Sequence, residues 1–255
     1  MEKPKISILL PVFNEGINLK IMLKILKATI EVPHEIIVVY DIESDDSIPV
    51  VKDVQKNYPN LKLVHNKIGR GVVNAIKSGV NAAYGDYILI LVADDVGPVL
   101  AVEDMLYLMD KGCDFVSTTR YAYGGRRYGG SLISRVLSKI ANKLFIYLAG
   151  SSITDCTCGI KIFRKEVFNK INFECKPIGW AVALEFSIKV QMSNWKLGEV
   201  PIISINRFYG GKSTFRPGPW ISEYSKWFFK GIRILRSSSN KREIEVHIPK
   251  HISES

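Results

Sequence analysis

Fully apolar segments alternate with amphipathic segments over residues 5–92, and this alternation constrains the fold more than any other feature. The pattern predicts strands at residues 5–12, 35–40, 61–65 and 87–92, and helices at residues 15–28, 45–58 and 71–83. Strands that are apolar throughout bury both of their faces, so helices must cover both sides of the sheet that they form. We therefore expect an α/β fold with a mostly parallel central sheet and helices on both faces.

Acidic residues follow two of these predicted strands. Asp41 comes after the second strand, and the adjacent pair Asp94 and Asp95 comes after the fourth. Open parallel sheets bind ligands at the carboxyl ends of their strands. A carboxylate pair there suits Mg²⁺ or Mn²⁺ bridging to a phosphate, because these ions prefer oxygen ligands. A solvated turn with an N-capping aspartate is the alternative.

The charge balance favours anionic partners. Lys and Arg number 35 against 25 acidic residues, a net charge of +10, which suits nucleic acid, phosphorylated metabolites or acidic lipid. Nucleic acid is not expected, because no aromatic-basic RNA signature is present. No apolar run approaches the roughly 20 residues that span a bilayer, so we expect a cytoplasmic protein, peripheral on the cytoplasmic face of the membrane. The four cysteines lack zinc-site spacing and are expected to be free thiols.

The remainder of the chain is less regular. The pattern predicts a loop at residues 124–130, helices at 131–148 and 180–193, a strand at 196–207 and a basic loop at 210–213. Residues 219–236 follow helical spacing, and the tail beyond residue 237 is polar and expected to be poorly ordered. We therefore expect a main domain at residues 1–217, followed at 218–255 by an amphipathic basic helix and a polar tail.

Eight short segments occur in an order that resembles the family 2 glycosyltransferases of the GT-A fold. They are ISILLPVFNEGINL, IIVVYDIESDDS, GRGVVNAIKSGVNAAYGDYILILVADD, TTRY, SRVLSKIANKLF, TDCTCGIKIFRKEV, LGEVPI and NRFYGGKST. Within that family the chain looks most like the dolichyl- or polyprenyl-phosphate sugar synthases. The resemblance implies sugar transfer from a nucleotide-diphosphate donor with help from Mg²⁺ or Mn²⁺.

The resemblance also implies roles for individual residues. Asp94 matches the second aspartate of the family's Asp-x-Asp metal motif, and Val92 replaces the first. Asp95 is expected to compensate as a second metal ligand, the alternative being a neighbour that binds the ion through water. Expected catalytic residues are Asp94, Asp95 and Arg120. Expected donor-binding residues are Pro11, Asn14, Glu15, Asp41, Arg207 and Lys212, and expected acceptor-phosphate residues are Ser134 and Arg135. Arg126 and Arg127 either close over the donor or form ordinary basic surface.

The acceptor is inferred from what the chain lacks. A hydroxyl acceptor needs a general base, whereas a phosphate acceptor is already ionised. Polysaccharide-building members carry a Glu-Asp pair and a Gln-x-x-Arg-Trp motif, and neither occurs here. We therefore expect a polyprenyl phosphate acceptor, attacked in line with inversion at the anomeric carbon. The alternatives are a glycan or soluble hydroxyl acceptor, with Glu185 or Asp155 as base, and a nucleotide-sugar-binding protein with weak catalysis.

Two amphipathic helices are candidates for peripheral membrane contact, at residues 131–148 and 219–236. The second is the stronger candidate, because Trp220, Trp227 and Phe228 lie beside basic residues. Packing against the domain core or a second subunit is the competing explanation. The residues leave the sugar, the nucleotide base and the oligomeric state open.

Overall fold

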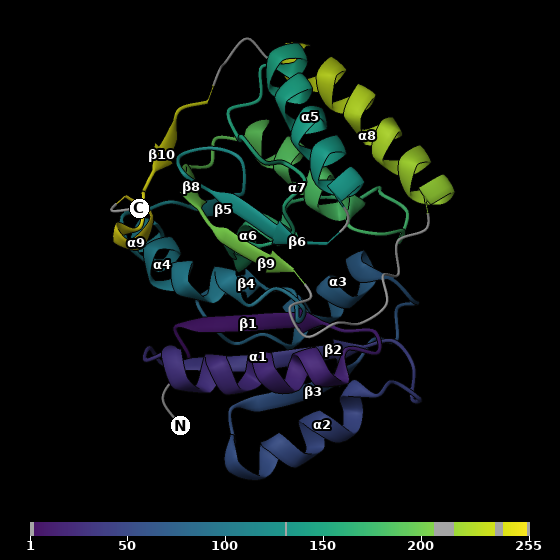
Figure 1. Ribbon diagram of the computed structural model, residues 1–255, viewed down its shortest axis with the longest axis vertical. Helices are drawn as coiled ribbons and strands as arrows, with labels where there is room; N and C mark the ends of the chain where they lie inside the picture. Colours follow the sequence, from purple (N-terminus) through teal and green to yellow (C-terminus); the bar gives the residue numbers. More distant parts are fainter. Residues whose placement is uncertain (1–2, 131, 207–216, 238–241, 254–255) are drawn as a thin grey trace.

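The computed structural model describes residues 3–130, 132–206, 217–237 and 242–253 (Figure 1). The amino-terminal part follows the predicted alternation. Its elements are β1 (Ile6–Pro11), α1 (Gly16–Thr29), β2 (His34–Tyr40), α2 (Ser47–Val54), β3 (Leu61–His65), α3 (Val72–Ala82) and β4 (Tyr87–Ile90). Each strand ends within two or three residues of the predicted end, so the acidic residues follow β2 and β4 as expected.

The carboxyl-terminal part contains more strands than the sequence predicts. Its elements are α4 (Val102–Asp110), β5 (Phe115–Thr119), β6 (Arg126–Gly129), α5 (Leu132–Ala149), β7 (Lys161–Arg164), α6 (Lys165–Asn169), α7 (Ala181–Gln191), β8 (Leu197–Pro201), β9 (Ile203–Asn206), α8 (Pro217–Ser237), β10 (Ile244–Val246) and α9 (Lys250–Ser253). The strand predicted at 196–207 divides at Ile202, because β9 leaves the main sheet and pairs with β6. Residues 126–129, predicted as loop, form β6.

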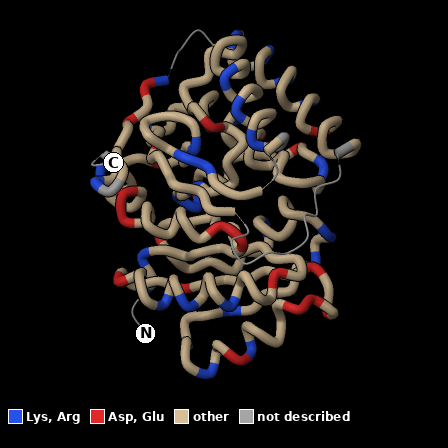
Figure 2. The backbone as a smooth tube through the Cα atoms, in the orientation of Figure 1, with Lys and Arg blue, Asp and Glu red and all other residues tan. Residues whose placement is uncertain are grey.

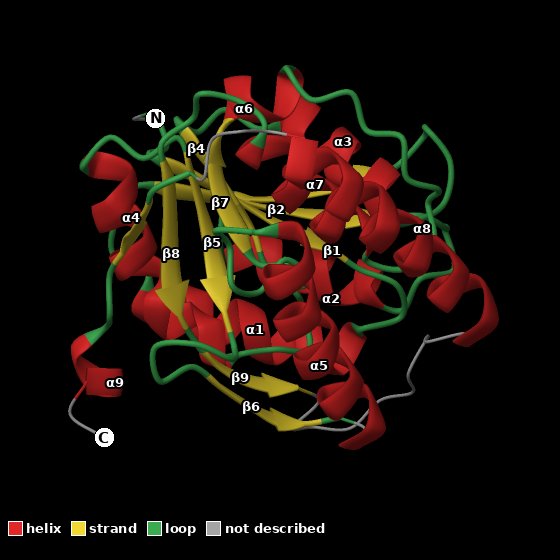
Figure 3. Ribbon diagram, turned by 90° about the horizontal axis from the view of Figure 1, so that it is seen from above, coloured by secondary structure: helices red, strands yellow, loops and turns green. Residues whose placement is uncertain are grey.

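The main sheet has eight strands in the order β10-β8-β5-β7-β4-β1-β2-β3. All neighbours run parallel except β7, which is antiparallel to both β4 and β5. The predicted mostly parallel sheet is therefore confirmed. Figure 3 shows β5 and β8 pointing toward the small β6–β9 sheet, which lies beyond their carboxyl ends.

Helices cover both faces of the main sheet, as the apolar strands require. One buried cluster joins the sheet to α1, α2 and α4, through side chains such as Leu19, Val51 and Met105. The other joins it to α3, α5, α7 and α8, through side chains such as Ile76, Phe145 and Phe186. The four cysteines are buried free thiols, as expected.

The segment after residue 217 contributes to this core. Trp227 of α8 is fully buried against α5 and α7, and Phe228 packs against the same cluster. The expectation that the tail lacks structure is wrong at residues 244–246, because β10 pairs in parallel with β8 at the edge of the sheet. No helix within the described ranges is long and apolar enough to cross a membrane.

Candidate active site

The β1–α1 loop is held at the carboxyl edge of the sheet by the β2–α2 loop. Asn14 has a positive φ of 54° and is exposed, and its backbone N–H donates to Asp45 Oδ2 at 3.1 Å. The next two backbone N–H groups donate to Ser47 Oγ at 3.1 Å and to Asp46 Oδ1 at 2.8 Å. These contacts fix Asn14 and Glu15 just beyond the end of β1, beside the half-buried Pro11.

Asp41 shapes the loop that precedes α3. Its Oδ1 accepts a hydrogen bond from Asn66 Nδ2 at 2.7 Å, and its Oδ2 accepts one from the backbone N–H of Gly71 at 2.8 Å. Asn66 Nδ2 also donates to the carbonyl of Gly69 at 2.7 Å. Asp41 therefore lies at the predicted edge, where it holds the loop at residues 67–71 in place.

Asp95 is almost fully buried, with 3% of its surface exposed. Its carboxylate accepts hydrogen bonds from Ser204 Oγ at 2.5 Å, the backbone N–H of Ile205 at 2.7 Å and Asn206 Nδ2 at 3.2 Å. Burial is the main cause that raises the pKa of Asp95, and the adjacent charge of Asp94 adds to it, while the bonds from Ser204 and Ile205 oppose the shift. Asp95 thus anchors β9 to the turn that follows β4.

The close approach of β9 requires a glycine at position 97, two residues after Asp95. A Cβ atom at this position would lie 1.8 Å from the carbonyl oxygen of Ile203. Any side chain there would push β9 away from the turn and stretch the bonds to Asp95. The glycine therefore allows the close packing that Asp95 needs.

The residues present fit a divalent cation only with oxygens from the substrate. No cluster of three or more His, Cys, Asp or Glu side chains placed to hold a metal occurs in the described part of the chain. Asp94 is half-buried in the same turn, whereas Asp95 already accepts three hydrogen bonds. Mg²⁺ commonly binds through one or two carboxylates, substrate phosphates and waters. Asp94 together with a donor diphosphate matches that pattern.

Arg120 forms a buried ion pair with Asp155. Its Nε donates to Asp155 Oδ2 at 2.7 Å and one terminal nitrogen donates to Oδ1 at 2.9 Å, a bidentate geometry. Burial alone would lower the pKa of Arg120, but the charge of Asp155 holds it well above its ordinary value. Burial alone would raise the pKa of Asp155, and Arg120 lowers it instead. Thr157 and Asn142 complete the network, which joins β5 to α5.

Arg127 of β6 and Arg135 in the first turn of α5 are joined by a hydrogen bond. Arg127 Nε donates to Asn206 Oδ1 at 3.1 Å, and a terminal nitrogen of Arg135 donates to the carbonyl of Arg127 at 3.4 Å. Arg135 Nε is buried and has no hydrogen-bond partner among the described residues. Arg207, Lys212 and the side chain of Ser134 lie outside the described residues.

Sequence reasoning missed Ser204 and Asn206. They alternate along one short strand, so their side chains share a face, and both donate to Asp95. The sequence signal for these residues was a pair of polar residues two positions apart, shortly after an apolar strand. The prediction of one continuous strand at 196–207 concealed it.

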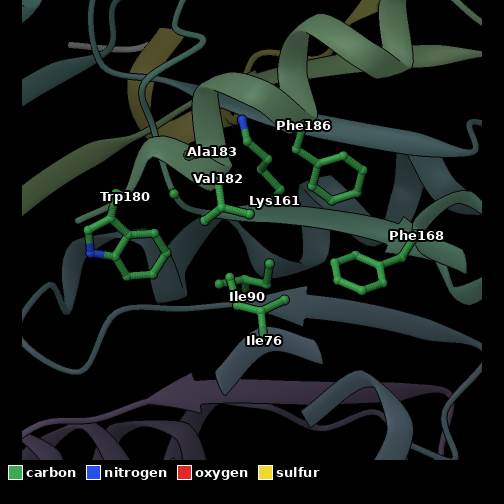
Figure 4. A pocket seen from close by; sticks show the side chains of 9 residues that line it. Ile76, Ile90, Lys161, Phe168, Trp180, Val182, Ala183 and Phe186 are labelled. Atoms are coloured by element: carbon green, nitrogen blue, oxygen red, sulfur yellow. The ribbon is translucent and has the colours of Figure 1, made fainter. Parts of the chain in front are cut away.

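A cavity of about 10 Å³ lies between the sheet and α7, away from these residues (Figure 4). Its lining is almost entirely apolar, from side chains such as Ile90, Trp180 and Phe186, and a space of this size holds about one water molecule. The ammonium of Lys161 turns away from the cavity in Figure 4 and donates to Ser117 Oγ at 3.0 Å. The cavity is therefore a small packing gap and has no room for a substrate.

Comparison with known proteins agrees with this architecture. The glucosyl-3-phosphoglycerate synthase of Mycobacterium tuberculosis, solved with Mn²⁺, uridine diphosphate and phosphoglyceric acid, matches with a TM-score of 0.67 and 16% identity over 93% of this chain and 80% of that one. The same enzyme with Mg²⁺ and uridine diphosphate matches with a TM-score of 0.66. At this identity the likeness shows the GT-A fold, as the sequence predicted.

Curated relatives share more sequence. A dolichol-phosphate mannosyltransferase from Pyrococcus furiosus is 27% identical over 92% of this chain and 67% of the relative. An undecaprenyl-phosphate 4-deoxy-4-formamido-L-arabinose transferase from Yersinia enterocolitica is 29% identical over 64% of this chain, which spans half of the relative's length. The model of glycosyl transferase family 2 matches residues 7–172. The chain therefore belongs to glycosyl transferase family 2 and is a glycosyltransferase.

Proposed function

We propose that the chain moves a sugar from a nucleoside-diphosphate donor to a polyprenyl phosphate at a membrane surface. The named relatives act on dolichol phosphate or undecaprenyl phosphate, which supports this acceptor class. The predicted residues from β1, β2 and β4 lie at one sheet edge, where open α/β sheets bind nucleotides. Pro11, Asn14, Glu15 and Asp41 form the donor side of the site in this proposal.

Asp94 would hold a divalent cation together with the donor diphosphate. When bound, Mg²⁺ or Mn²⁺ would supply positive charge to the leaving diphosphate, and the complexes of the structural neighbours with these ions support its use. Asp95 serves the site indirectly, because its carboxylate fixes the turn that carries Asp94. Arg207 and Lys212 remain donor-binding candidates from the resemblance alone.

The proposed acceptor follows from the burial and hydrogen bonding of the two candidate general bases, Glu185 and Asp155. Glu185 is fully buried and accepts hydrogen bonds from the backbone N–H groups of Glu174 at 2.7 Å and Cys175 at 2.8 Å, and it pairs with Lys189 at 2.7 Å. Asp155 is fully buried and paired with Arg120. Neither carboxylate is available to take a proton from a hydroxyl. An acceptor that arrives ionised needs no such base, and a phosphate monoester meets that condition.

The reaction is a single displacement with inversion. An oxygen of the acceptor phosphate forms a bond to the anomeric carbon, the bond from that carbon to the diphosphate oxygen breaks, and the nucleoside diphosphate leaves with the electron pair. Arg127 and Arg135, with Ser134, bind the acceptor phosphate. Arg120 keeps the loop at residues 154–158 beside α5 through its pair with Asp155.

The lipid tail of the acceptor fits the outer face of α5. The exposed side of this helix carries Leu132, Val136, Leu137, Ile140, Leu144 and Tyr147, whose exposed fractions range from 47% to 82%. Lys139 and Lys143 lie exposed among them, and Figure 2 shows basic positions along this helix. A contiguous apolar face with flanking lysines suits the surface of an anionic membrane. Arg135, which we assign to the acceptor phosphate, lies in the first turn of the same helix and next in sequence to Val136, so this face begins beside the proposed phosphate site.

The structure changes which helix we propose for this contact. The sequence favoured residues 219–236 because of Trp220, Trp227 and Phe228. Trp227 has no exposed surface and is unavailable to a membrane, and Phe228 is partly buried against the core. Trp220 is also partly covered.

Transfer to a short polyprenyl phosphate tests the proposal. We expect wild-type protein with Mn²⁺ to transfer labelled sugar from one of a panel of nucleoside-diphosphate sugars to farnesyl phosphate. Asp94→Ala should reduce this transfer at least about 100-fold, because it removes charge stabilisation of the leaving group. Asp86→Ala, at an exposed carboxylate paired only with Lys3 among the ion pairs described, is the matched control and should stay active. Transfer to soluble hydroxyl acceptors with none to farnesyl phosphate would contradict the proposal.

A further inference from the structure

Asn206 joins the acidic turn after β4 to an arginine of the small β6–β9 sheet. Its Nδ2 donates to Asp95 Oδ2 at 3.2 Å, and its Oδ1 accepts from Arg127 Nε at 3.1 Å. We propose that Asn206 is a positioning residue, which holds the guanidinium of Arg127 at a fixed place to bind a phosphate of the reacting substrates. The inference rests on the proposed function for the identity of that phosphate.

The two partners determine how the amide lies. A carboxylate only accepts and a guanidinium only donates, so the NH₂ group must face Asp95 and the oxygen must face Arg127. Asparagine is the residue type that offers both groups at this length. Aspartate would place two carboxylates together, and a hydrophobic residue would contact neither partner.

The register of the small sheet brings these side chains together. Arg127 pairs with Ser204 and Gly129 pairs with Asn206, so Arg127 and Asn206 are diagonal neighbours. Gly129 leaves the space between them open, and a Cβ there would lie 2.3 Å from the carbonyl oxygen of Asn206. Ser204 and Asn206 both reach Asp95, so two side chains of β9 meet at one buried carboxylate in the turn after β4.

This connection links the two halves of the proposed site. Asp95 is adjacent to Asp94, which we assign to the cation and the donor diphosphate, and Arg127 is assigned to the acceptor phosphate. The path from Asp95 through Asn206 to Arg127 consists of two hydrogen bonds. A guanidinium held before substrate arrives loses less conformational freedom on binding. The protein therefore fixes where Arg127 lies relative to the turn that carries Asp94.

A double-mutant cycle tests this role. The variants are Asn206→Leu, Arg127→Ala and the pair together, measured for kcat and KM with farnesyl phosphate and for Kd with the Mn²⁺ complex of the nucleoside diphosphate. Asn206→Leu should lower kcat/KM for farnesyl phosphate about tenfold, and should have no further effect once Arg127 is alanine. Ser204→Ala is the matched control, because it removes a hydrogen bond to the same Asp95 without touching Arg127. It should lower the melting temperature, and it should lower kcat/KM by the same factor whether residue 127 is arginine or alanine, because it acts through the turn that carries Asp94.

Each outcome is decisive. Additive effects of Asn206→Leu and Arg127→Ala in both ligand assays would overturn the inference, since they would show that Asn206 acts independently of Arg127. Coupling seen only with the nucleoside diphosphate would keep the role of Asn206 and assign Arg127 to the donor. If wild-type protein neither binds nor uses farnesyl phosphate, the proposed acceptor is wrong, and the nucleoside diphosphate assay still tests the coupling. If Asn206→Leu does not fold, Asn206→Ser replaces it under the same criterion.

Discussion

The exposed apolar face of α5 offers the sharpest test of membrane contact. We consider Leu137→Ser combined with Ile140→Ser, at side chains that are 59% and 50% exposed. Full burial of such a side chain is worth about 1.5 to 3 kcal/mol, and about half of that surface remains available to a membrane. The double substitution should therefore weaken membrane binding by about 2 kcal/mol, or about 30-fold. Folding should change little, because both positions are on the surface.

Co-sedimentation with vesicles that contain an anionic phospholipid measures this effect. Leu100→Ser with Ile248→Ser is the matched control, since these side chains are 60% and 42% exposed and lie outside α5. The control should bind vesicles like the wild type. If the α5 variant binds vesicles as well as the wild type, this face is not the membrane contact. If both variants lose binding to the same extent, exposed apolar side chains contribute to vesicle binding wherever they lie on the protein.

Two further predictions concern buried charges. Asp155→Asn should lower the free energy of unfolding by about 3 to 5 kcal/mol, because it leaves the buried charge of Arg120 without its partner; an unchanged melting temperature would contradict this. Burial raises the pKa of Glu199 from 4.5 to about 7, so the folded protein binds its proton more tightly than the unfolded chain does. Between pH 5 and pH 8 wild-type protein should lose about 2.5 kcal/mol of stability that Glu199→Gln retains, and parallel pH profiles in urea denaturation would disprove it.

The sequence predicts the amino-terminal part of the fold well because one strong signal governs it. Strands such as β1 and β2 consist mostly of apolar residues, and α1 between them carries a long amphipathic pattern. Periodicity identifies such elements without tertiary information. The placement of Asp41 and Asp94 at the same edge of the sheet then follows from the parallel arrangement of β2 and β4 alone.

Elements that depend on distant partners were not predictable in this way. β7 has only four residues, and its place between β4 and β5 is set by antiparallel pairing with strands far away in the chain. β10 has three residues in a polar segment and exists through its pairing with β8. Short strands carry little local signal, so tertiary context decides them.

The two amphipathic helices illustrate the same limit. Periodicity shows that α5 and α8 each have an apolar side, but not what covers it. Trp227 of α8 packs into the core, while the outer side of α5 remains exposed at positions such as Leu137 and Tyr147. The aromatic residues of α8 made it the stronger membrane candidate in the sequence. Large rings suit a membrane interface and a protein core equally, so this signal could not separate the two.

The acidic pair after β4 is best understood as two carboxylates with different tasks. Neighbouring residues in a turn point in different directions, and here Asp95 faces the interior while Asp94 stays half-buried. A buried carboxylate is costly unless donors surround it, and Ser204, Ile205 and Asn206 supply three. β9 therefore cannot move without exposing unsatisfied groups at Asp95, and the turn that carries Asp94 cannot move without β9. This mutual dependence gives a reason for an aspartate beside Asp94 even where only one of them meets the cation.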